Sequence, residues 1–311
     1  MTRIFITRRL HPLALELLLE HFEVNVHDEN SPLPVEAFSE IVREYDGVLS
    51  TVIDRFDETL LRQRKKLQVI SNYAIGLDNI DVDYARANGV AVYNTPDVVT
   101  EPTADMTFAL LLALERKVGP AFEFIKQDQW RSWDPWLFLG RGLTGKVMGI
   151  HGFGRIGQAV GRRAVGFGMK VVYHDVQIRE VNDPLLAGAE AVDLDQLLER
   201  CHYLSIHVPL NKATRGLFNR QLLSRVRQRP ILLNMARGPV VDTEALVFAL
   251  QEGWLRGAAL DVTDPEPLSG SAPICKLENV IISPHIGTAT EECRRDMAEV
   301  AAQNLIRHFT S

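Results

Sequence analysis

The sequence predicts an α/β protein with two parallel-sheet domains, and three features of its 311 residues support this fold class. Short apolar segments alternate with amphipathic segments before residue 100, and the same alternation returns after residue 146. Such a pattern is typical of parallel strands covered by helices on both faces of a sheet. The third feature is a glycine-rich turn at residues 152–157, which follows an apolar strand and begins a helical pattern.

The first hundred residues predict a parallel sheet. The expected strands are residues 3–7, 22–26, 47–51, 67–71 and 90–93. The segments with apolar residues at helical spacing between them are residues 11–22, 34–45 and 57–66.

The middle of the chain predicts a buried helix followed by a loop. Residues 101–114 are mostly apolar, and Thr100 can cap this helix. A helix this apolar is buried on most of its sides. The loop after it contains Trp130, Trp133 and Trp136. Together the helix and the loop suggest a homodimer.

The second series begins at Lys146 and predicts six strands. They are residues 147–152, 170–175, 203–208, 230–235, 257–262 and 279–283. Six strands in about 140 residues match the size of a dinucleotide-binding domain. The final amphipathic helix, near residues 290–309, has no sheet of its own and is expected to pack on the first domain. The predicted domains are therefore residues 1–98 with 287–311, and residues 99–286.

Composition excludes several classes of protein. A formal charge of −6 argues against nucleic acid as a general partner. The three cysteines and nine scattered histidines show no metal-ligand spacing, so no metal site is expected. The apolar run near the N-terminus is too short for a secretory signal, and no segment is apolar enough to span a membrane. These features predict a cytoplasmic protein with no membrane partner.

The glycine-rich turn predicts a dinucleotide site of the Rossmann type. Gly152 permits a tight turn, Gly154 lets the backbone approach a pyrophosphate, and Gly157 allows close packing of helix on strand. The helix that follows presents its free N–H groups to the phosphates. The alternative is a purely structural turn.

Asp175 bears on which dinucleotide binds. It ends the next predicted strand, eighteen residues after Gly157, where an acid can accept the ribose hydroxyls and repel a 2′-phosphate. NAD is therefore favoured. Arg179 lies close enough in the sequence to bind a 2′-phosphate, so NADP is the alternative cofactor. Asp175 could also simply cap the strand.

Three polar residues follow strand ends of the second domain and suggest a reaction. Arg237 can bind a carboxylate through two parallel hydrogen bonds from its planar guanidinium. His285 is a plausible proton donor near neutral pH, and Glu266 beside it would favour the imidazolium. Such a set suits reduction of a 2-oxo acid. Taken singly, each residue has another explanation. Arg237 could form an ion pair, Glu266 could lie on a solvated loop, and His285 could cap a loop.

Several ordered motifs resemble the D-isomer-specific 2-hydroxyacid dehydrogenases over essentially the full length. They are the glycine-rich turn, SNYAIGLDNID at 71–81, NTPD at 94–97, HVPL at 207–210 with Thr214, NMARG at 234–238, DV at 261–262 with EP at 266–267, and SPH at 283–285. The resemblance implies a Rossmann NAD(P)-binding domain, a flavodoxin-like substrate domain and a cleft between them.

The resemblance also implies roles for individual residues. Arg237 would bind and polarise the substrate, His285 would donate the proton, and Glu266 would pair with His285. The N–H groups of Ile75 and Gly76 would hold the substrate carboxylate. The implied cofactor-binding residues are Thr103, Gly152, Gly154, Arg155, Ile156, Gly157, Asp175, His207, Pro209, Thr214, Ala236 and Asp261, the last at the nicotinamide carboxamide.

Within the family, residues 71–81, 94–105 and 130–140 look most like glyoxylate/hydroxypyruvate reductases. This implies NAD(P)H-dependent reduction of small 2-oxo acids to D-2-hydroxy acids. Trp133 would then reach into the active site of the neighbouring subunit and contact substrate, or it would only pack in the interface. Two alternatives remain open: a phosphoglycerate dehydrogenase, and a non-enzymatic NAD(H)-sensing protein that keeps the same three catalytic residue types.

Overall fold

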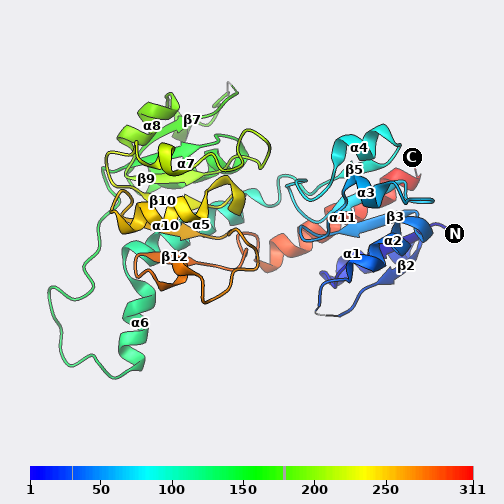
Figure 1. Cartoon of the computed structure of the whole chain (residues 1–311), viewed down its shortest axis with the longest axis horizontal. Coiled ribbons are helices and arrows are strands. Elements are labelled where there is room, and N and C mark those ends of the chain that lie inside the picture. The colour runs from blue at the N-terminus through cyan, green and yellow to red at the C-terminus, as the bar shows by residue number, and fades with distance from the viewer. Residues whose placement is uncertain (30, 178–179, 311) are drawn as a thin grey trace. The chain divides into compact units, whose positions relative to one another are not determined.

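The computed structural model describes residues 1–29, 31–177 and 180–310 (Figure 1). The chain divides into two compact units. The first consists of Met1–Val99 with Ala289–Ser311, and the second of Thr100–Thr288. These boundaries lie within two residues of those that the sequence predicts.

The first unit is built on a five-stranded parallel sheet with the order β2-β1-β3-β4-β5. Its strands are β1 (Arg3–Ile6), β2 (Glu23–Val26), β3 (Gly47–Ser50), β4 (Val69–Asn72) and β5 (Ala91–Tyr93). All five predicted strands are present, and their order is the flavodoxin-like one. The fold class expected for this part of the chain is therefore confirmed.

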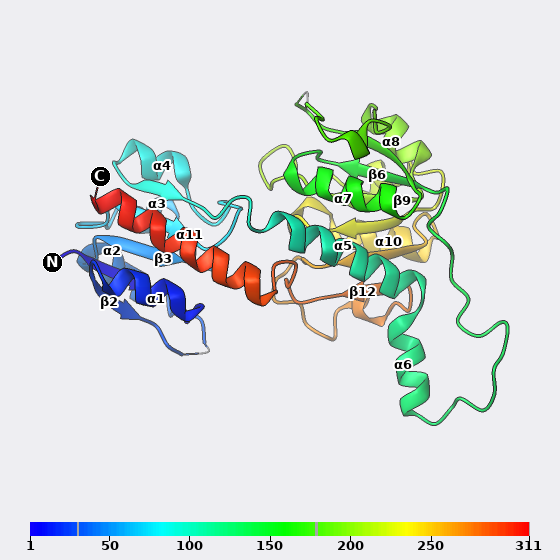
Figure 2. The same cartoon turned by 180° about the vertical axis from the view of Figure 1, so that it is seen from behind.

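Within the described residues, this unit has five helices. They are α1 (Pro12–Leu19), α2 (Val35–Glu44), α3 (Glu58–Leu61), α4 (Val82–Ala87) and α11 (Glu291–Thr310). The sequence prediction omitted α4, whose six residues are too few to show a helical period. Helix α11 lies beside α1 and against β4 (Figure 2). Its small buried residues Ala298, Ala301 and Ala302 let the helix approach the sheet closely.

The second unit contains a seven-stranded parallel sheet with the order β12-β11-β10-β9-β6-β7-β8. Its strands are β6 (Val147–His151), β7 (Lys170–His174), β8 (Glu190–Ala191), β9 (Tyr203–Ile206), β10 (Ile231–Asn234), β11 (Gly257–Leu260) and β12 (Val280–Ile282). This is the Rossmann order with one strand added. The sequence prediction missed β8, because its two residues are both exposed and form no apolar run.

The remaining helices all lie in this unit. They are α5 (Thr100–Glu115), α6 (Val118–Lys126), α7 (Arg155–Gly166), α8 (Leu194–Arg200), α9 (Arg220–Leu223) and α10 (Thr243–Gln251). Short 3₁₀ turns occur at Pro184–Leu186, Gly238–Val240 and Pro273–Lys276.

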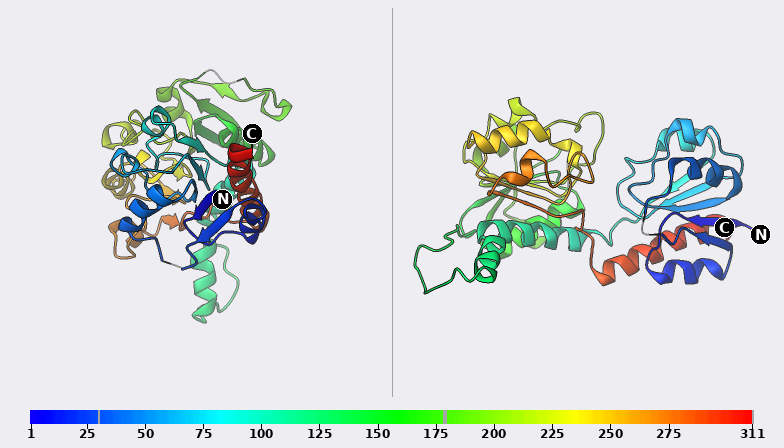
Figure 3. Two further views of the ribbon diagram at one scale, coloured as in Figure 1. Left: turned by 90° about the vertical axis from the view of Figure 1, so that its right-hand side faces the viewer. Right: turned by 60° about the horizontal axis from the view of Figure 1, so that its bottom comes forward.

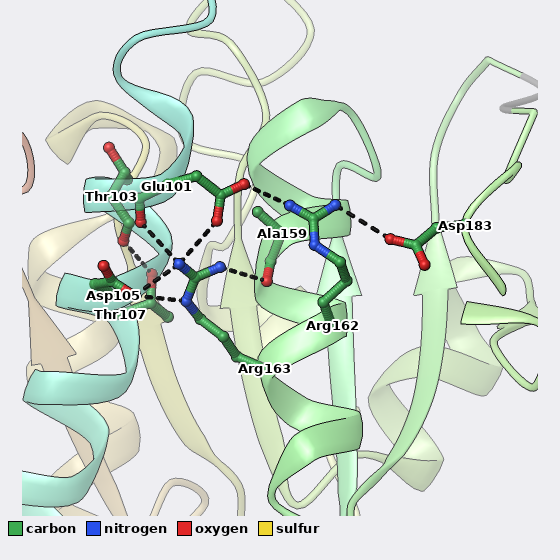
Figure 4. Close-up of polar contacts among 8 residues, drawn as sticks. All are labelled: Glu101, Thr103, Asp105, Thr107, Ala159, Arg162, Arg163 and Asp183. Carbon is green, nitrogen blue, oxygen red and sulfur yellow. Dashed lines mark hydrogen bonds and ion pairs between the residues drawn. The ribbon is translucent and has the colours of Figure 1, made fainter. Parts of the chain in front are cut away.

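Two arginines fix α7, the helix after the glycine-rich turn, to α5 (Figure 4). Arg163 Nη2 lies 2.6 Å from Asp105 Oδ1 and 2.9 Å from Glu101 Oε2. Arg162 bridges Glu101 Oε1 at 2.5 Å and Asp183 Oδ2 at 3.3 Å. The ion pairs supplement the apolar contact in which Ala104, Phe108 and Leu111 are buried.

Helix α6 and the tryptophan-containing loop extend from the second sheet, as both views of Figure 3 show. None of the residues of α6 is buried, and Phe122 and Ile125 are exposed. The side chains of Trp133 and Trp136 are 80% and 77% exposed. Among the described residues, no helix combines the length and apolar character needed to cross a membrane.

Candidate active site

Most of the predicted site residues of the second unit lie at one edge of its sheet, where the parallel strands end. Between β6 and β9 the strand order reverses, which is where open α/β sheets bind ligands. The residues that follow the successive strand ends are Gly152, Asp175, His207, Arg237, Asp261 and His285.

The glycine-rich turn has the geometry that close approach requires. Gly152 has a φ of +93°, and a Cβ there would lie 2.7 Å from the His207 carbonyl. A Cβ on Gly157 would overlap the Gly152 carbonyl oxygen, so only glycine lets α7 pack this closely on β6. A Cβ on Gly154 would meet no protein atom within 4 Å. The turn is therefore closely packed against the protein at Gly152 and Gly157 and open at Gly154.

Helix α7 begins at this open point. Its N-cap is Gly154, which offers no side chain to the first N–H groups of the helix. Arg155 and Ile156 form the first turn. An uncapped helix N-terminus carries free N–H donors and a partial positive charge. The turn and helix therefore fit a bound pyrophosphate.

Asp175 lies next to the same turn. Its Oδ2 accepts a hydrogen bond from the Phe153 N–H at 2.8 Å, and its Oδ1 accepts one from the Gln177 N–H at 2.9 Å. Each carboxylate oxygen has further lone pairs, so ribose hydroxyls can also be accepted. Arg179, which could serve a 2′-phosphate, lies outside the described residues.

Three histidines underlie the turn. The His151 and His174 rings stack with centroids 5.1 Å apart, and their Nδ1 atoms are 3.1 Å apart. One nitrogen must donate and the other accept, so at least one ring is neutral. Burial, followed by the charge of His174, lowers the pKa of His151 to about 4. Burial likewise lowers the pKa of His207 to about 3, and its Nε2 contacts Ser205 Oγ at 2.7 Å.

The lowered pKa of His151 predicts acid lability. The unfolded chain binds a proton near pH 6.5 that the folded chain excludes down to about pH 4. Stability is therefore lost as the pH falls through this window, by about 3 kcal/mol for this one group. His151→Asn is expected to flatten the dependence of the unfolding free energy on pH, measured by denaturant titration at pH 7 and pH 4.5. An equally steep dependence in the variant would show that other groups cause it.

The other predicted cofactor residues lie on neighbouring segments. Thr103 is buried on α5, and its Cγ2 lies 3.7 Å from the Cβ position of Gly287. Thr214 Oγ1 donates to the Pro209 carbonyl at 2.6 Å, which fixes the loop after β9. Ala236 is buried after β10 and accepts from Arg237 Nη1 at 2.8 Å.

Arg237 is held by the turn that follows β10. Asn234 Nδ2 donates to the Arg237 carbonyl at 2.9 Å, and Asn234 Oδ1 accepts from the Ala236 N–H at 3.1 Å. The Arg237 backbone is extended, and its side chain is half-buried. Asn234, itself 1% exposed, thus fixes the direction in which the chain leaves the strand.

His285 and Glu266 form a close pair. His285 Nδ1 lies 2.5 Å from Glu266 Oε1, although the two residues are 19 positions apart in the sequence. Burial raises the pKa of Glu266, but the hydrogen bond and charge of His285, the Thr263 N–H and the charge of Arg237 together lower it below its ordinary value. Glu266 is therefore a carboxylate at neutral pH, and Arg237 lies within electrostatic reach of it.

Asp261 anchors the loop that carries His285. Its carboxylate accepts from Ser283 Oγ at 2.6 Å, from the Ile286 N–H at 2.8 Å and from the Gly287 N–H at 2.7 Å. The Asp261 carbonyl accepts the His285 N–H at 2.8 Å. His285 has a φ of +55° in this arrangement. Asp261, which is predicted to contact the nicotinamide carboxamide, therefore also fixes the backbone of His285, the predicted proton donor.

Ile75 and Gly76 lie in the first unit, on the loop after β4. The carbonyls of Ala74, Ile75 and Gly76 each accept a hydrogen bond from the protein. Within the described part of the chain, the N–H groups of Ile75 and Gly76 make no hydrogen bond that would compete with a ligand. Two adjacent free donors suit an anion.

Trp133 lies in the exposed loop after α6. Three supporting residues have no individual role in the sequence-based prediction: His174, Asn234 and Ser283. Asn234 and Ser283 belong to the motifs that flank Arg237 and His285, and that proximity is the only sequence signal for them. Among the described residues, no group of three or more His, Cys, Asp or Glu side chains is placed to hold a metal ion.

Comparison with known proteins identifies the family. The model described as "D-isomer specific 2-hydroxyacid dehydrogenase, NAD binding domain" matches residues 108–287, more than half of the chain. A glyoxylate reductase of Thermococcus litoralis is 43% identical over 308 residues, covering 98% of this chain and 92% of the relative.

Solved structures agree with this. A protein of Thermus thermophilus has a TM-score of 0.91 at 43% identity, covering 98% of this chain and 96% of its own. The NADPH-dependent glyoxylate/hydroxypyruvate reductase of Sinorhizobium meliloti, in complex with NADP and malonate, has a TM-score of 0.85 at 30% identity, covering 100% and 94%. The resemblance that the motifs carry is confirmed. The chain belongs to the D-isomer-specific 2-hydroxyacid dehydrogenase family and is an NAD(P)-dependent oxidoreductase.

Proposed function

We propose that this enzyme reduces small 2-oxo acids, such as glyoxylate or hydroxypyruvate, to D-2-hydroxy acids. The observation that carries the proposal is the 2.5 Å pair of His285 and Glu266, within electrostatic reach of Arg237 and at the same sheet edge as the glycine-rich turn. The relatives named glyoxylate reductase support the substrate class.

Each side chain has a distinct task in this reaction. Arg237 binds the substrate through charge-assisted hydrogen bonds and polarises its carbonyl. The N–H groups of Ile75 and Gly76 hold the substrate carboxylate, so the domain predicted from the sequence, residues 1–98 with 287–311, is the substrate-binding domain. His285 donates a proton to the carbonyl oxygen, while the Glu266 carboxylate keeps the imidazole oriented. A bound nicotinamide supplies the hydride to the carbonyl carbon.

Initial rates of cofactor oxidation test the proposal. The panel is glyoxylate, hydroxypyruvate, pyruvate, 2-ketogluconate and 3-phosphohydroxypyruvate, each with NADH and with NADPH. We expect the highest kcat/KM with glyoxylate or hydroxypyruvate. A preference for 3-phosphohydroxypyruvate would instead identify a phosphoglycerate dehydrogenase. Tight NADH binding without turnover of any member would favour a sensor.

We further propose that NADH is preferred over NADPH, because Asp175 would accept the ribose hydroxyls and repel a 2′-phosphate. Asp175→Asn removes the charge but keeps an oxygen that can accept the Phe153 N–H. A hydrogen bond to a charged group contributes about 1.5–3 kcal/mol, so the kcat/KM ratio of NADH to NADPH should fall about 10- to 100-fold. The ratio is measured with saturating glyoxylate. An unchanged ratio would mean that the ribose is recognised elsewhere.

The proposal extends to a cytoplasmic homodimer in which α6 and the tryptophan-containing loop contact a second copy. These segments carry exposed apolar side chains, among them Phe122, Ile125 and Trp133. Aromatic side chains of this kind are enriched in protein interfaces.

Trp133→Ala tests whether the tryptophan only packs in the interface or also reaches the substrate. If it reaches the substrate, KM for glyoxylate should rise about tenfold, the effect of losing roughly 1.4 kcal/mol of contact, while light scattering still reports a dimer. An unchanged KM in a dimeric variant would restrict Trp133 to packing. A monomeric wild-type protein would contradict the homodimer itself.

A further inference from the structure

The loop that carries Ile75 and Gly76 has its peptide planes fixed from behind. The Thr95 N–H donates to the Ala74 carbonyl at 2.9 Å, and Asn94 Nδ2 donates to the Ile75 carbonyl at 2.8 Å. Asn72 Nδ2 donates to the Gly76 carbonyl at 2.9 Å. Three successive carbonyls are therefore turned towards the protein.

Fixing a carbonyl also fixes the next N–H. The loop contains no cis peptide bond, and in a trans peptide the C=O and the following N–H point in opposite directions. The bond from Thr95 to the Ala74 carbonyl therefore orients the Ile75 N–H. In the same way, the Asn94 side chain orients the Gly76 N–H.

The two asparagines are themselves held in place. Asn72 is fully buried, and its Oδ1 accepts from Ser50 Oγ at 3.0 Å, while its Nδ2 also contacts Asn79 Oδ1 at 3.1 Å. The Asn94 carbonyl accepts from Asn304 Nδ2 of α11 at 3.0 Å. The amides thus belong to a network that is formed before any substrate binds. Because the donors are already oriented, little free energy is spent on ordering them when the substrate binds.

We infer that Asn94 is a positioning residue for substrate binding, supported by Asn72: its amide aims the Gly76 N–H at the substrate carboxylate. The inference rests on the proposed function, because that function places the carboxylate at Ile75 and Gly76. Asn94 touches no reacting atom in this account. It acts only through the peptide plane that it fixes.

Asn94→Ala tests the inference with little disturbance of packing, since Asn94 is half-buried whereas Asn72 is fully buried. The matched control is Asn88→Ala. Asn88 is also half-buried, and its Nδ2 makes an equally long 2.8 Å bond to a backbone carbonyl, that of Tyr84 in α4. The probes are glyoxylate kinetics and the Kd of oxalate for the enzyme saturated with NADH, measured by titration calorimetry.

For Asn94→Ala we expect KM for glyoxylate and Kd for oxalate to rise about tenfold or more, because a hydrogen bond to a charged group is weakened. The Kd of NADH and the reduction of methylglyoxal, which has no carboxylate, should stay near the wild-type values. Asn88→Ala should match the wild type in every measurement. A general loss of structure would instead change all of these values together.

The outcomes separate the inference from the proposed function. If the wild type reduces glyoxylate and Asn94→Ala binds oxalate as tightly, the inference is wrong and the function stands. If the wild type binds oxalate without reducing glyoxylate, the function is wrong, and the oxalate Kd of Asn94→Ala still decides the inference. A wild type that does neither overturns both.

Discussion

Replacing His285 by asparagine is expected to lower kcat for glyoxylate reduction by about a thousandfold at pH 7, because a positioned general acid contributes about 10²–10⁴ in rate. The Kd of NADH should stay near the wild-type value, since His285 lies after β12 and not at the glycine-rich turn. Steady-state kinetics and NADH fluorescence titration measure the two quantities. An unchanged kcat would rule out His285 as the proton donor.

Glu266→Gln is the matched control for His285→Asn, because it changes the other member of the His285–Glu266 pair. It keeps an acceptor for His285 at the observed 2.5 Å contact but removes the negative charge. Because the amide oxygen of glutamine can still accept the His285 Nδ1–H, the imidazole should stay oriented, and the variant should keep more activity than His285→Asn. Steady-state kinetics at pH 7 compares the two variants. Equal losses in both variants would indicate a structural effect.

Replacing Arg237 by alanine is expected to lower kcat/KM for glyoxylate by about 10²–10³, because two charge-assisted hydrogen bonds to the substrate are lost. Much of the loss should appear in KM. Arg237 also lowers the pKa of Glu266, so the variant should show a small shift of the pH–rate profile as well. Steady-state kinetics over a range of pH measures both effects.

Arg237→Lys distinguishes geometry from charge. Lysine keeps the positive charge but cannot form the planar, two-pronged contact of the guanidinium. Its activity should therefore lie between those of the wild type and Arg237→Ala. A lysine variant as active as the wild type would reduce the role of Arg237 to simple charge, and an active alanine variant would remove the role altogether.

The parts of this molecule that depend on local sequence could be predicted, and the reason is physical. The glycine-rich turn is specified by Gly152 and Gly157, where any side chain would collide with the neighbouring backbone. The interior strands β3, β4, β9, β10 and β11 are buried at every residue, so each is rich in apolar residues. Strand β8 and helix α4 were missed because they offer two and six residues to a periodic pattern. Helix α6 was also missed, and a loop was predicted in its place, because Gly119 and Pro120 near its start are typical of loops.

The candidate site depends on contacts that sequence spacing does not contain. His285 and Glu266 meet because β11 and β12 are neighbours in the sheet and their carboxyl ends carry the two loops. The anchoring of the His285 loop by Asp261 follows from the same adjacency. The amide of Asn94 reaches the Ile75 carbonyl only because β4 and β5 pair side by side. Motif resemblance could name the residues, but tertiary pairing determines what each one supports.

Isotope labelling follows the hydride from the cofactor to the product and so tests the proposed reaction itself. The enzyme is incubated with hydroxypyruvate and NADH deuterated at both C4 positions, and the glycerate formed is analysed by mass spectrometry and chiral chromatography. If the proposed reaction is right, the product is D-glycerate with one deuterium at C2. Unlabelled glycerate, the L-isomer, or no glycerate at all would contradict it.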